Sequence, residues 1–229
     1  MKLSILIPCY NEVATIEKVL HRVQSAPWPD KEIIVVDDGS TDGTAELLRG
    51  DLASRADQVV FHPDNRGKGA AVRTGLAQVT GQIVIIQDAD LEYDPEAYPR
   101  LVKPIVEDLA DAVFGSRFIG PGPHRCMYFR HYLGNRLLTF VSNLFSDLNL
   151  TDMETGCKAF RTEVLQSLHL QEDRFGFEPE VTAKLARSGR RVYEIGIPYH
   201  GRTYAEGKKI TWRDGLHALY CILRYNLLA

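Results

Sequence analysis

The chain has 229 residues, of which 45% are hydrophobic and 25% charged, and its formal net charge is −3. A chain of this length and apolar content can bury a sizeable core without covalent cross-links. The lack of a net positive charge argues against nucleic acid as a partner, and no run approaches the roughly 18 unbroken apolar residues that a membrane span requires.

The cysteines and the first residues indicate where the protein acts. The four cysteines are far apart and form no CxxC pair, and the stretch MKLSILIPCY is not a signal peptide. We therefore expect free thiols and a cytoplasmic location. From the chain length we expect a single domain over residues 1–229.

Short apolar runs alternate with helical patterns through the first half of the chain. Because continuous apolar strands separated by helices are typical of a parallel sheet covered on both faces, the pattern predicts a doubly wound α/β domain with a mostly parallel sheet. In such a sheet, ligands bind beyond the carboxyl ends of the strands. The expected strands are residues 3–8, 32–38, 58–62, 82–90 and 111–118, and the expected helices are residues 11–24, 44–53, 67–79 and 95–109.

After about residue 120 the alternation stops. Apolar residues at helical spacing predict amphipathic helices over residues 133–148 and 211–228, with a strand over 191–200 between them. The apolar stripe of such a helix packs on the protein's own core or lies on a membrane surface, and both interpretations stay open. The side chains that suit an interface are Trp212, Arg213, Tyr220, Arg224 and Tyr225.

Four carboxylates end the strand expected at residues 82–90. Asp94, directly before Pro95, is typical of a helix N-cap. Asp88 and Asp90 lie two residues apart, so both can point into the crevice, where they repel each other unless a cation neutralises them. A divalent ion such as Mg²⁺ or Mn²⁺ would do so and leave positions for diphosphate oxygens. Glu92 is a candidate third ligand.

Polar residues also follow the first two strands. Tyr10 and Glu12 could stack on a base and contact a ribose, and Asp37 could accept hydrogen bonds from either group. The segment NRGKGAA lacks the G-x-x-x-x-G-K-[ST] pattern of a P-loop, so we reject that match. Lys68 is either a phosphate contact or a solvated cation.

The motifs IPCYNE, VVDDGSTDGT, NRGKGAA, DAD, GSR and DMETGCKAFR occur in this order over nearly the whole chain. This set resembles family 2 glycosyltransferases of the GT-A fold, most closely the dolichol-phosphate mannose synthases and bacterial polyprenyl-phosphate sugar transferases. The resemblance implies a nucleotide-sugar-binding half over residues 1–118 and an acceptor half over 119–229. The activity that it implies is a metal-dependent, inverting transfer of glucose or mannose from a UDP or GDP donor. The residues that it assigns are Pro8, Tyr10, Glu12 and Asp37 to the nucleoside, and Asp88 and Asp90 to the metal, with Glu92 where relatives often carry Gln.

Cations of the second half indicate the acceptor. The resemblance implies that Arg117, Arg130, Arg202 and Lys208 surround phosphates, although surface solvation is the alternative for each. A phosphate monoester, with a second pKa of about 6, is ionised near neutral pH and can be its own nucleophile, whereas a sugar hydroxyl needs a general base. Asp152 and Glu154 are candidates for that base or for contacts to the donor sugar.

Three functions stay open at this point. The leading one transfers a hexose to a polyprenyl phosphate, the second transfers it to a saccharide hydroxyl, and the third is a non-catalytic nucleotide-binding or receiver-like module. The Arg-rich residues beyond 119 are not expected of a receiver. For the leading function we expect a nucleoside diphosphate sugar, a polyprenyl phosphate and the cytoplasmic face of a membrane as partners, reached peripherally or through a membrane-anchoring protein.

Overall fold

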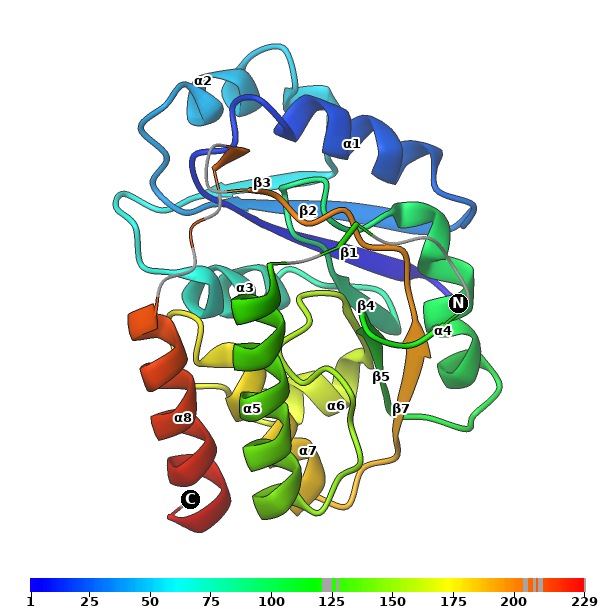
Figure 1. Ribbon diagram of the computed structural model, residues 1–229. Helices are drawn as coiled ribbons and strands as arrows, with labels where there is room; N and C mark the ends of the chain where they lie inside the picture. The colour runs from blue at the N-terminus through cyan, green and yellow to red at the C-terminus, as the bar shows by residue number, and fades with distance from the viewer. Residues whose placement is uncertain (121–124, 127, 204–205, 208, 210–211, 229) are drawn as a thin grey trace.

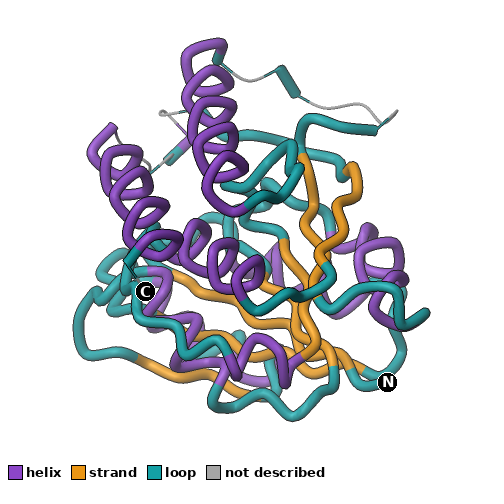
Figure 2. Tube along the Cα trace, turned by 90° about the horizontal axis from the view of Figure 1, so that it is seen from below, coloured by secondary structure: helices purple, strands orange, loops and turns teal. Residues whose placement is uncertain are grey.

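In the computed structural model, which describes residues 1–120, 125–126, 128–203, 206–207, 209 and 212–228, helices flank one twisted sheet (Figures 1 and 2). The strands are β1 (Leu3–Cys9), β2 (Lys31–Asp37), β3 (Gln58–Phe61), β4 (Ile83–Ile86), β5 (Ala112–Ser116), β6 (Lys158–Arg161) and β7 (Val192–Gly196). The α-helices are α1 (Ile16–Ser25), α2 (Thr44–Arg49), α3 (Lys68–Leu76), α4 (Tyr98–Val106), α5 (Phe129–Ser146), α6 (Thr162–Ser167), α7 (Phe177–Arg187) and α8 (Trp212–Leu227).

The strand order is β3-β2-β1-β4-β6-β5-β7, and both halves of the chain contribute strands. The predicted α/β architecture is confirmed. The sheet is mostly parallel, as predicted, and β6 is the exception, since it pairs antiparallel with both β4 and β5. This strand is only four residues long, with basic residues at both ends, so its sequence carries no clear apolar run. The order reverses beside β1, which is where α/β sheets bind ligands.

Two apolar layers lie on opposite faces of the sheet. In β1, Ile5 and Ile7 pack with α1 and α4, whereas Leu6 points to the other face, toward α3 and α7. This alternation follows from the two-residue period of a strand. Each such fully buried aliphatic side chain contributes about 1.5–3 kcal/mol to folding, so these two layers hold the strand ends in place.

Several element boundaries differ from those predicted. Helix α1 begins at Ile16 rather than residue 11, because Asn11 adopts a left-handed φ of 50° that a helix cannot include. Asp94 caps the turn Pro95–Ala97 that precedes α4, accepting a hydrogen bond from the Glu96 N–H at 3.1 Å as predicted. Helix α5 begins four residues earlier than expected, and neither α6 nor α7 was predicted.

Helices α5 and α8 stand side by side at one end of the molecule, and α8 also packs on α7 (Figure 1). The buried face of α8 consists of Ala218, Cys221, Ile222 and Tyr225. The predicted apolar stripe faces outward instead, since Leu216 and Leu227 are each 59% exposed. An interface role is wrong for Tyr225, which is buried and packs against Ala183 and Cys221, with its hydroxyl donating to Glu172 at 2.8 Å.

No described helix combines the length and the apolar character needed to cross a bilayer. The exposed apolar side chains are concentrated on α5 and α8 and on the residues before α5. They include Tyr128, Phe129, Leu133, Leu137, Phe140, Leu144, Trp212, Leu216, Tyr220 and Leu227, which we call the apolar face.

Candidate functional site

One groove of about 1990 Å³ opens at the carboxyl ends of β1, β4 and β5 and continues between α5 and α8. Its inner end carries charged side chains, and its outer end is lined by apolar residues such as Leu137, Val141 and Leu219. Most of the predicted site residues line it: Pro8, Tyr10, Glu12, Lys68, Asp88, Asp90, Glu92, Arg117, Arg130, Glu154 and Arg202.

Two predicted residues are not part of this lining, and a third is not among the described residues. Asp37 is buried at the end of β2, where Oδ2 accepts from the Ser40 N–H at 3.2 Å and Oδ1 meets no hydrogen-bond donor among the described residues. Asp152 is fully buried behind Arg117. Lys208 lies outside the described residues. The nucleoside role of Asp37 and the donor-sugar role of Asp152 stay predictions.

Arg202 lies among the carboxylates at the inner end of the groove. Its Nη1 is 2.9 Å from Glu12 Oε2, and its Nη2 is 3.0 Å from Glu12 Oε1 and 3.3 Å from Asp90 Oδ2. The backbone N–H of Arg202 donates to Glu92 at 2.6 Å, and the Tyr199 hydroxyl donates to the other oxygen of Glu92 at 2.8 Å. The structure therefore brings a predicted acceptor cation onto the predicted donor carboxylates.

Asp90 occupies a strongly acidic and enclosed position. Burial, with the negative charges of Asp88 and Glu92, raises the pKa of Asp90 to about 7, and Arg202 only partly opposes this rise. The next residue, Leu91, has a left-handed φ of 64°, a conformation that a branched side chain rarely adopts. Backbone strain of this kind is often found at functional sites, so this turn is a candidate part of the site.

These carboxylates have the oxygen ligands that Mg²⁺ and Mn²⁺ prefer. The nearby cations Lys68 and Arg202 indicate that the position demands positive charge. The donor set therefore fits a hard divalent ion. The ligand oxygens of Asp88, Asp90 and Glu92 are not all gathered within 4.8 Å in this conformation, and both oxygens of Glu92 already accept hydrogen bonds. The role of Glu92 as third ligand stays a prediction.

Lys68, at the first position of α3, bridges two acids. Its Nζ lies 2.8 Å from Asp88 Oδ1 and 2.9 Å from Glu178 Oε1. Burial opposes its charge, but these two carboxylates raise the pKa of Lys68 well above its ordinary value. The turn before it is held by Asp38, which accepts from the Gly67 N–H at 2.7 Å. Lys68 is therefore a paired cation rather than a solvated one.

Glu178 was missed by the sequence analysis. It lies in the first turn of α7 and is buried, and it also lines the groove. Two acidic residues followed closely by a helical pattern, at Glu178 and Glu180, are typical of a helix start. That signal could have located the helix, but not the contact with Lys68.

Arg117, directly after β5, is held by a bidentate ion pair. Its Nε and Nη2 lie 2.7 and 2.6 Å from the oxygens of Asp152, which also accepts from the Arg117 N–H at 2.9 Å. Such a pair fixes the guanidinium plane. Arg117 lines the groove and Asp152 lies behind it. The guanidinium carbon of Arg117 is also 5.4 Å from the centroid of the Tyr199 ring.

Glu154 is the predicted acid with the freest carboxylate. The residue is half-buried, but its Oε1 is enclosed and meets no hydrogen-bond donor among the described residues. Burial and the negative charge of Glu178 raise the pKa of Glu154 to about 8, against the opposing charges of Lys158 and Arg117. A carboxyl group with this pKa can exchange a proton near neutral pH.

Arg130 lies near the start of α5, where the charged and apolar parts of the groove meet. It is exposed, and within the described ranges it forms no ion pair. Unlike Lys68, Arg117 and Arg202, it is not neutralised by a carboxylate.

Comparisons with known proteins agree with this geometry. The family model of glycosyl transferase family 2 matches residues 4–168. The undecaprenyl-phosphate mannosyltransferase of Micrococcus luteus is 31% identical, over 91% of this chain and 87% of that protein. The dolichol-phosphate mannosyltransferase of Pyrococcus furiosus is 29% identical, over 99% of this chain but 65% of that protein.

Solved structures share the fold. The crystal structure of glucosyl-3-phosphoglycerate synthase from Mycobacterium tuberculosis with Mn²⁺, UDP and glucosyl-3-phosphoglycerate matches 98% of this chain and 80% of that chain, with a TM-score of 0.76 and 24% identity. The same synthase has also been crystallised with Mg²⁺ and UDP, with a TM-score of 0.72. At this identity the likeness establishes the architecture alone.

Proposed function

The chain belongs to glycosyl transferase family 2 and has the GT-A fold, and we propose that this glycosyltransferase moves glucose or mannose from a UDP or GDP donor to a polyprenyl phosphate. The observation that carries the proposal is the groove, which joins buried carboxylates and cations at one end to apolar helix faces at the other. A lipid phosphate has the same two parts.

The donor would lie at the inner end of the groove. Tyr10 and Glu12 follow β1, beside the point where the strand order reverses, and the unpartnered Oδ1 of Asp37 is an acceptor that a base or ribose could satisfy. Asp88 and Asp90, with Glu92 as candidate third ligand, would hold Mg²⁺ or Mn²⁺, which would neutralise charge on the leaving diphosphate.

The acceptor phosphate would enter past Arg130 and lie near Arg117 and Arg202. An ionised phosphate oxygen attacks the anomeric carbon as the bond from that carbon to the diphosphate oxygen breaks, so the configuration inverts and the nucleoside diphosphate leaves. Because the phosphate is already ionised, the protein needs to supply only in-line positioning and positive charge. Arg117 is well suited to positioning, because Asp152 holds it rigidly.

The apolar face supports a lipid acceptor. Phe140 and Leu144 on α5 are 65% and 67% exposed, and the same helix lines the groove through Leu137 and Val141. Contiguous exposed apolar patches mark interaction surfaces. We propose that this face lies on the cytoplasmic surface of a membrane, directly or beside an anchoring protein, so that a prenyl chain reaches the groove without crossing water.

Glu154 supports a second candidate, transfer to a saccharide hydroxyl. Its raised pKa and its unpartnered oxygen in the groove suit a general base. A hydroxyl acceptor needs such a base, whereas an ionised phosphate does not. The two candidates therefore differ in the consequence of Glu154→Gln, which would abolish transfer to a hydroxyl but spare transfer to a phosphate.

The deciding experiment offers the purified protein radiolabelled UDP-glucose or GDP-mannose, Mg²⁺ or Mn²⁺, and a short-chain polyprenyl phosphate. We expect label in an organic-extractable product, and loss of that product in Asp90→Asn with the fold intact by circular dichroism. Label that appears only in oligosaccharide, when a mixed saccharide acceptor is added, would show that the lipid proposal is wrong.

A further inference from the structure

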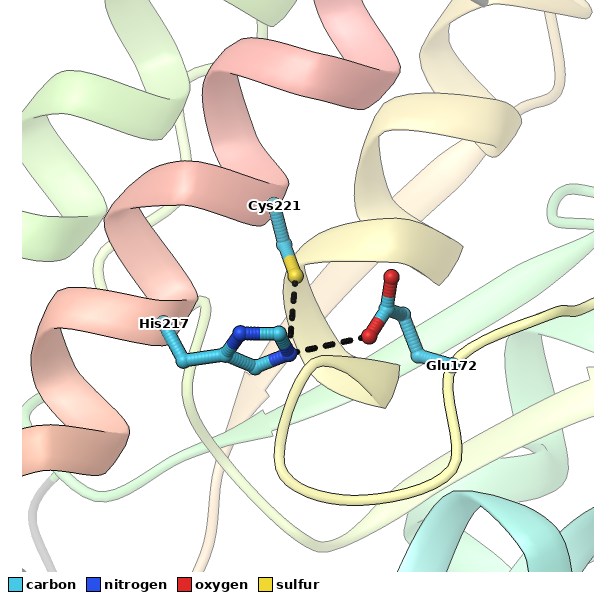
Figure 3. A group of neighbouring side chains, drawn as sticks. All are labelled: Glu172, His217 and Cys221. Carbon is cyan, nitrogen blue, oxygen red and sulfur yellow. Dashed lines mark hydrogen bonds and ion pairs between the residues drawn. The ribbon is translucent and has the colours of Figure 1, made fainter.

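Three side chains of metal-binding type meet where α8 faces the segment before α7 (Figure 3). His217 Nε2 lies 2.9 Å from Glu172 Oε2 and 3.4 Å from Cys221 Sγ. One ligand atom from each residue lies within 4.8 Å of the other two, and this is the one His, Cys, Asp or Glu group in the described residues to do so. None of the three belongs to the lining of the groove.

Local structure brings the three together. His217 and Cys221 are four residues apart on α8, so they project from the same side of the helix. Glu172 comes from the segment before α7. Glu180 holds that segment in place, accepting the backbone N–H groups of Gln171 at 2.7 Å and Glu172 at 2.8 Å. The third ligand is therefore positioned before any ion arrives.

We propose that Glu172, His217 and Cys221 form a zinc site. Nitrogen, sulfur and carboxylate oxygen are the ligands that Zn²⁺ takes, at about 2.0–2.3 Å, so tetrahedral ligand atoms lie roughly 3.3–3.6 Å apart. The observed separations of 2.9 and 3.4 Å need only small side-chain movements to admit the ion. The thiolate favours zinc over Mg²⁺ and Mn²⁺.

The surroundings suit three protein ligands and a water. The His217 side chain is 43% exposed, which leaves an open fourth position, whereas that of Glu172 is only 9% exposed. The second oxygen of Glu172 accepts from the Tyr225 hydroxyl at 2.8 Å and from Arg224 at 3.3 Å, so it is oriented and Oε2 stays available. Binding would release the Cys221 thiol proton to solvent.

Gly176 makes the site possible sterically. A Cβ at this position would lie 2.7 Å from Glu172 Oε2 and 2.8 Å from Cys221 Sγ, both too close for a side chain. The glycine thus lets the backbone close one side of the cluster without occupying the space between the ligand atoms.

An ion here would tie α8 to the segment that supports the catalytic groove. The Asp173 carbonyl accepts from the Ala70 N–H at 3.0 Å in α3, two residues beyond Lys68. Leu216 and Leu219 of α8 line the outer groove. The zinc site would fix the apolar wall relative to the charged end, while using different elements and different ligand chemistry from the carboxylates Asp88 and Asp90.

The test uses folded protein that has been treated with a chelator and never unfolded. This protein is titrated with Zn²⁺ and, separately, with Co²⁺. We expect one Zn²⁺ per chain, a higher melting temperature on zinc addition, and a thiolate-to-cobalt charge-transfer band with Co²⁺. Cys221→Ser and His217→Ala should lose all three responses. Cys126→Ser, which removes an exposed cysteine outside the cluster, is the matched control and should keep them.

Two further variants sharpen the result. Tyr225→Phe should weaken zinc binding about tenfold, since it removes an outer partner of a ligand. Asp90→Asn should leave zinc stoichiometry unchanged, which separates this site from the groove. Folded wild-type protein that binds no zinc, or a cobalt band that survives in Cys221→Ser, would overturn the assignment.

Discussion

Arg202 and Glu12 form a bidentate ion pair across 190 residues of sequence, with both Nη atoms within 3.0 Å of the carboxylate oxygens. The pair joins the turn after β1 to the segment after β7. Arg202 also reaches Asp90 at 3.3 Å. A residue predicted for the acceptor phosphate thus pairs with two carboxylates predicted for the donor, and Lys209 also reaches Glu12 at 2.8 Å. Under the proposed function, the acceptor cation and the metal would share these carboxylates.

Arg202→Ala tests this sharing. Without the guanidinium, Glu12 and Asp90 lose a competing cation, so we expect Mn²⁺ to bind severalfold more tightly in the absence of nucleotide. Turnover should nevertheless fall by about 10²-fold, because the proposed function places this cation on the reacting phosphates. Mn²⁺ titration followed by electron paramagnetic resonance, together with the lipid-transfer assay, measures both. Arg100→Ala, an exposed arginine on α4, is the control. Unchanged turnover would make Arg202 purely structural.

Lys68→Met removes the cation between Asp88 and Glu178. Two enclosed carboxylates then face each other unpaired, and we expect the free energy of unfolding to drop by about 3 kcal/mol in urea denaturation. Lys103→Met provides the comparison, since that lysine forms an exposed i,i+4 pair with Glu107 at 3.7 Å that is worth at most about 0.5 kcal/mol. Equal losses in the two variants would contradict the bridging role.

Glu154 makes stability depend on pH. Its carboxyl pKa is raised from 4.5 to about 8, first by burial and then by Glu178, so the folded chain holds this proton more tightly than the unfolded chain. This proton stabilises the folded state to its full extent below about pH 4.5. The free energy of unfolding should then decline as the pH rises to about 8. In Glu154→Gln this decline should be smaller. At the alkaline end, the free energy of unfolding of the variant should exceed that of wild type by at least about 1 kcal/mol. Parallel urea curves for both proteins at every pH would refute the prediction.

Phe140→Ser with Leu144→Ser tests the apolar face. Wild-type protein should float with liposomes that contain anionic lipid, and the double variant should lose most of that association, because both side chains are largely exposed on α5. Their removal should change the melting temperature little, since exposed side chains contribute little packing. Val106→Ser, an exposed apolar residue on α4, should float like wild type. If wild-type protein does not float, the apolar face binds a protein partner rather than a membrane.

Sequence reasoning located the strand-end residues well. Tyr10, Asp88 and Arg117 follow buried apolar runs, and a run of that kind predicts both the strand and the edge at which it ends. The Asp94 cap was predictable for the same reason, because an N-cap depends on neighbours within a few residues. Short β6 and helix α7 were not predictable, since their few apolar residues have no clear period and their placement comes from packing.

Local periodicity therefore determined the α/β alternation, the carboxylate pair and the helices α5 and α8, because each depends on residues near one another in the chain. Only the tertiary structure decided that α8 turns its stripe outward, that Glu178 completes the Lys68 bridge, and that Arg202 reaches Glu12. Those outcomes depend on contacts between segments far apart in sequence, where the competing burial of many side chains, rather than any local pattern, selects the partner.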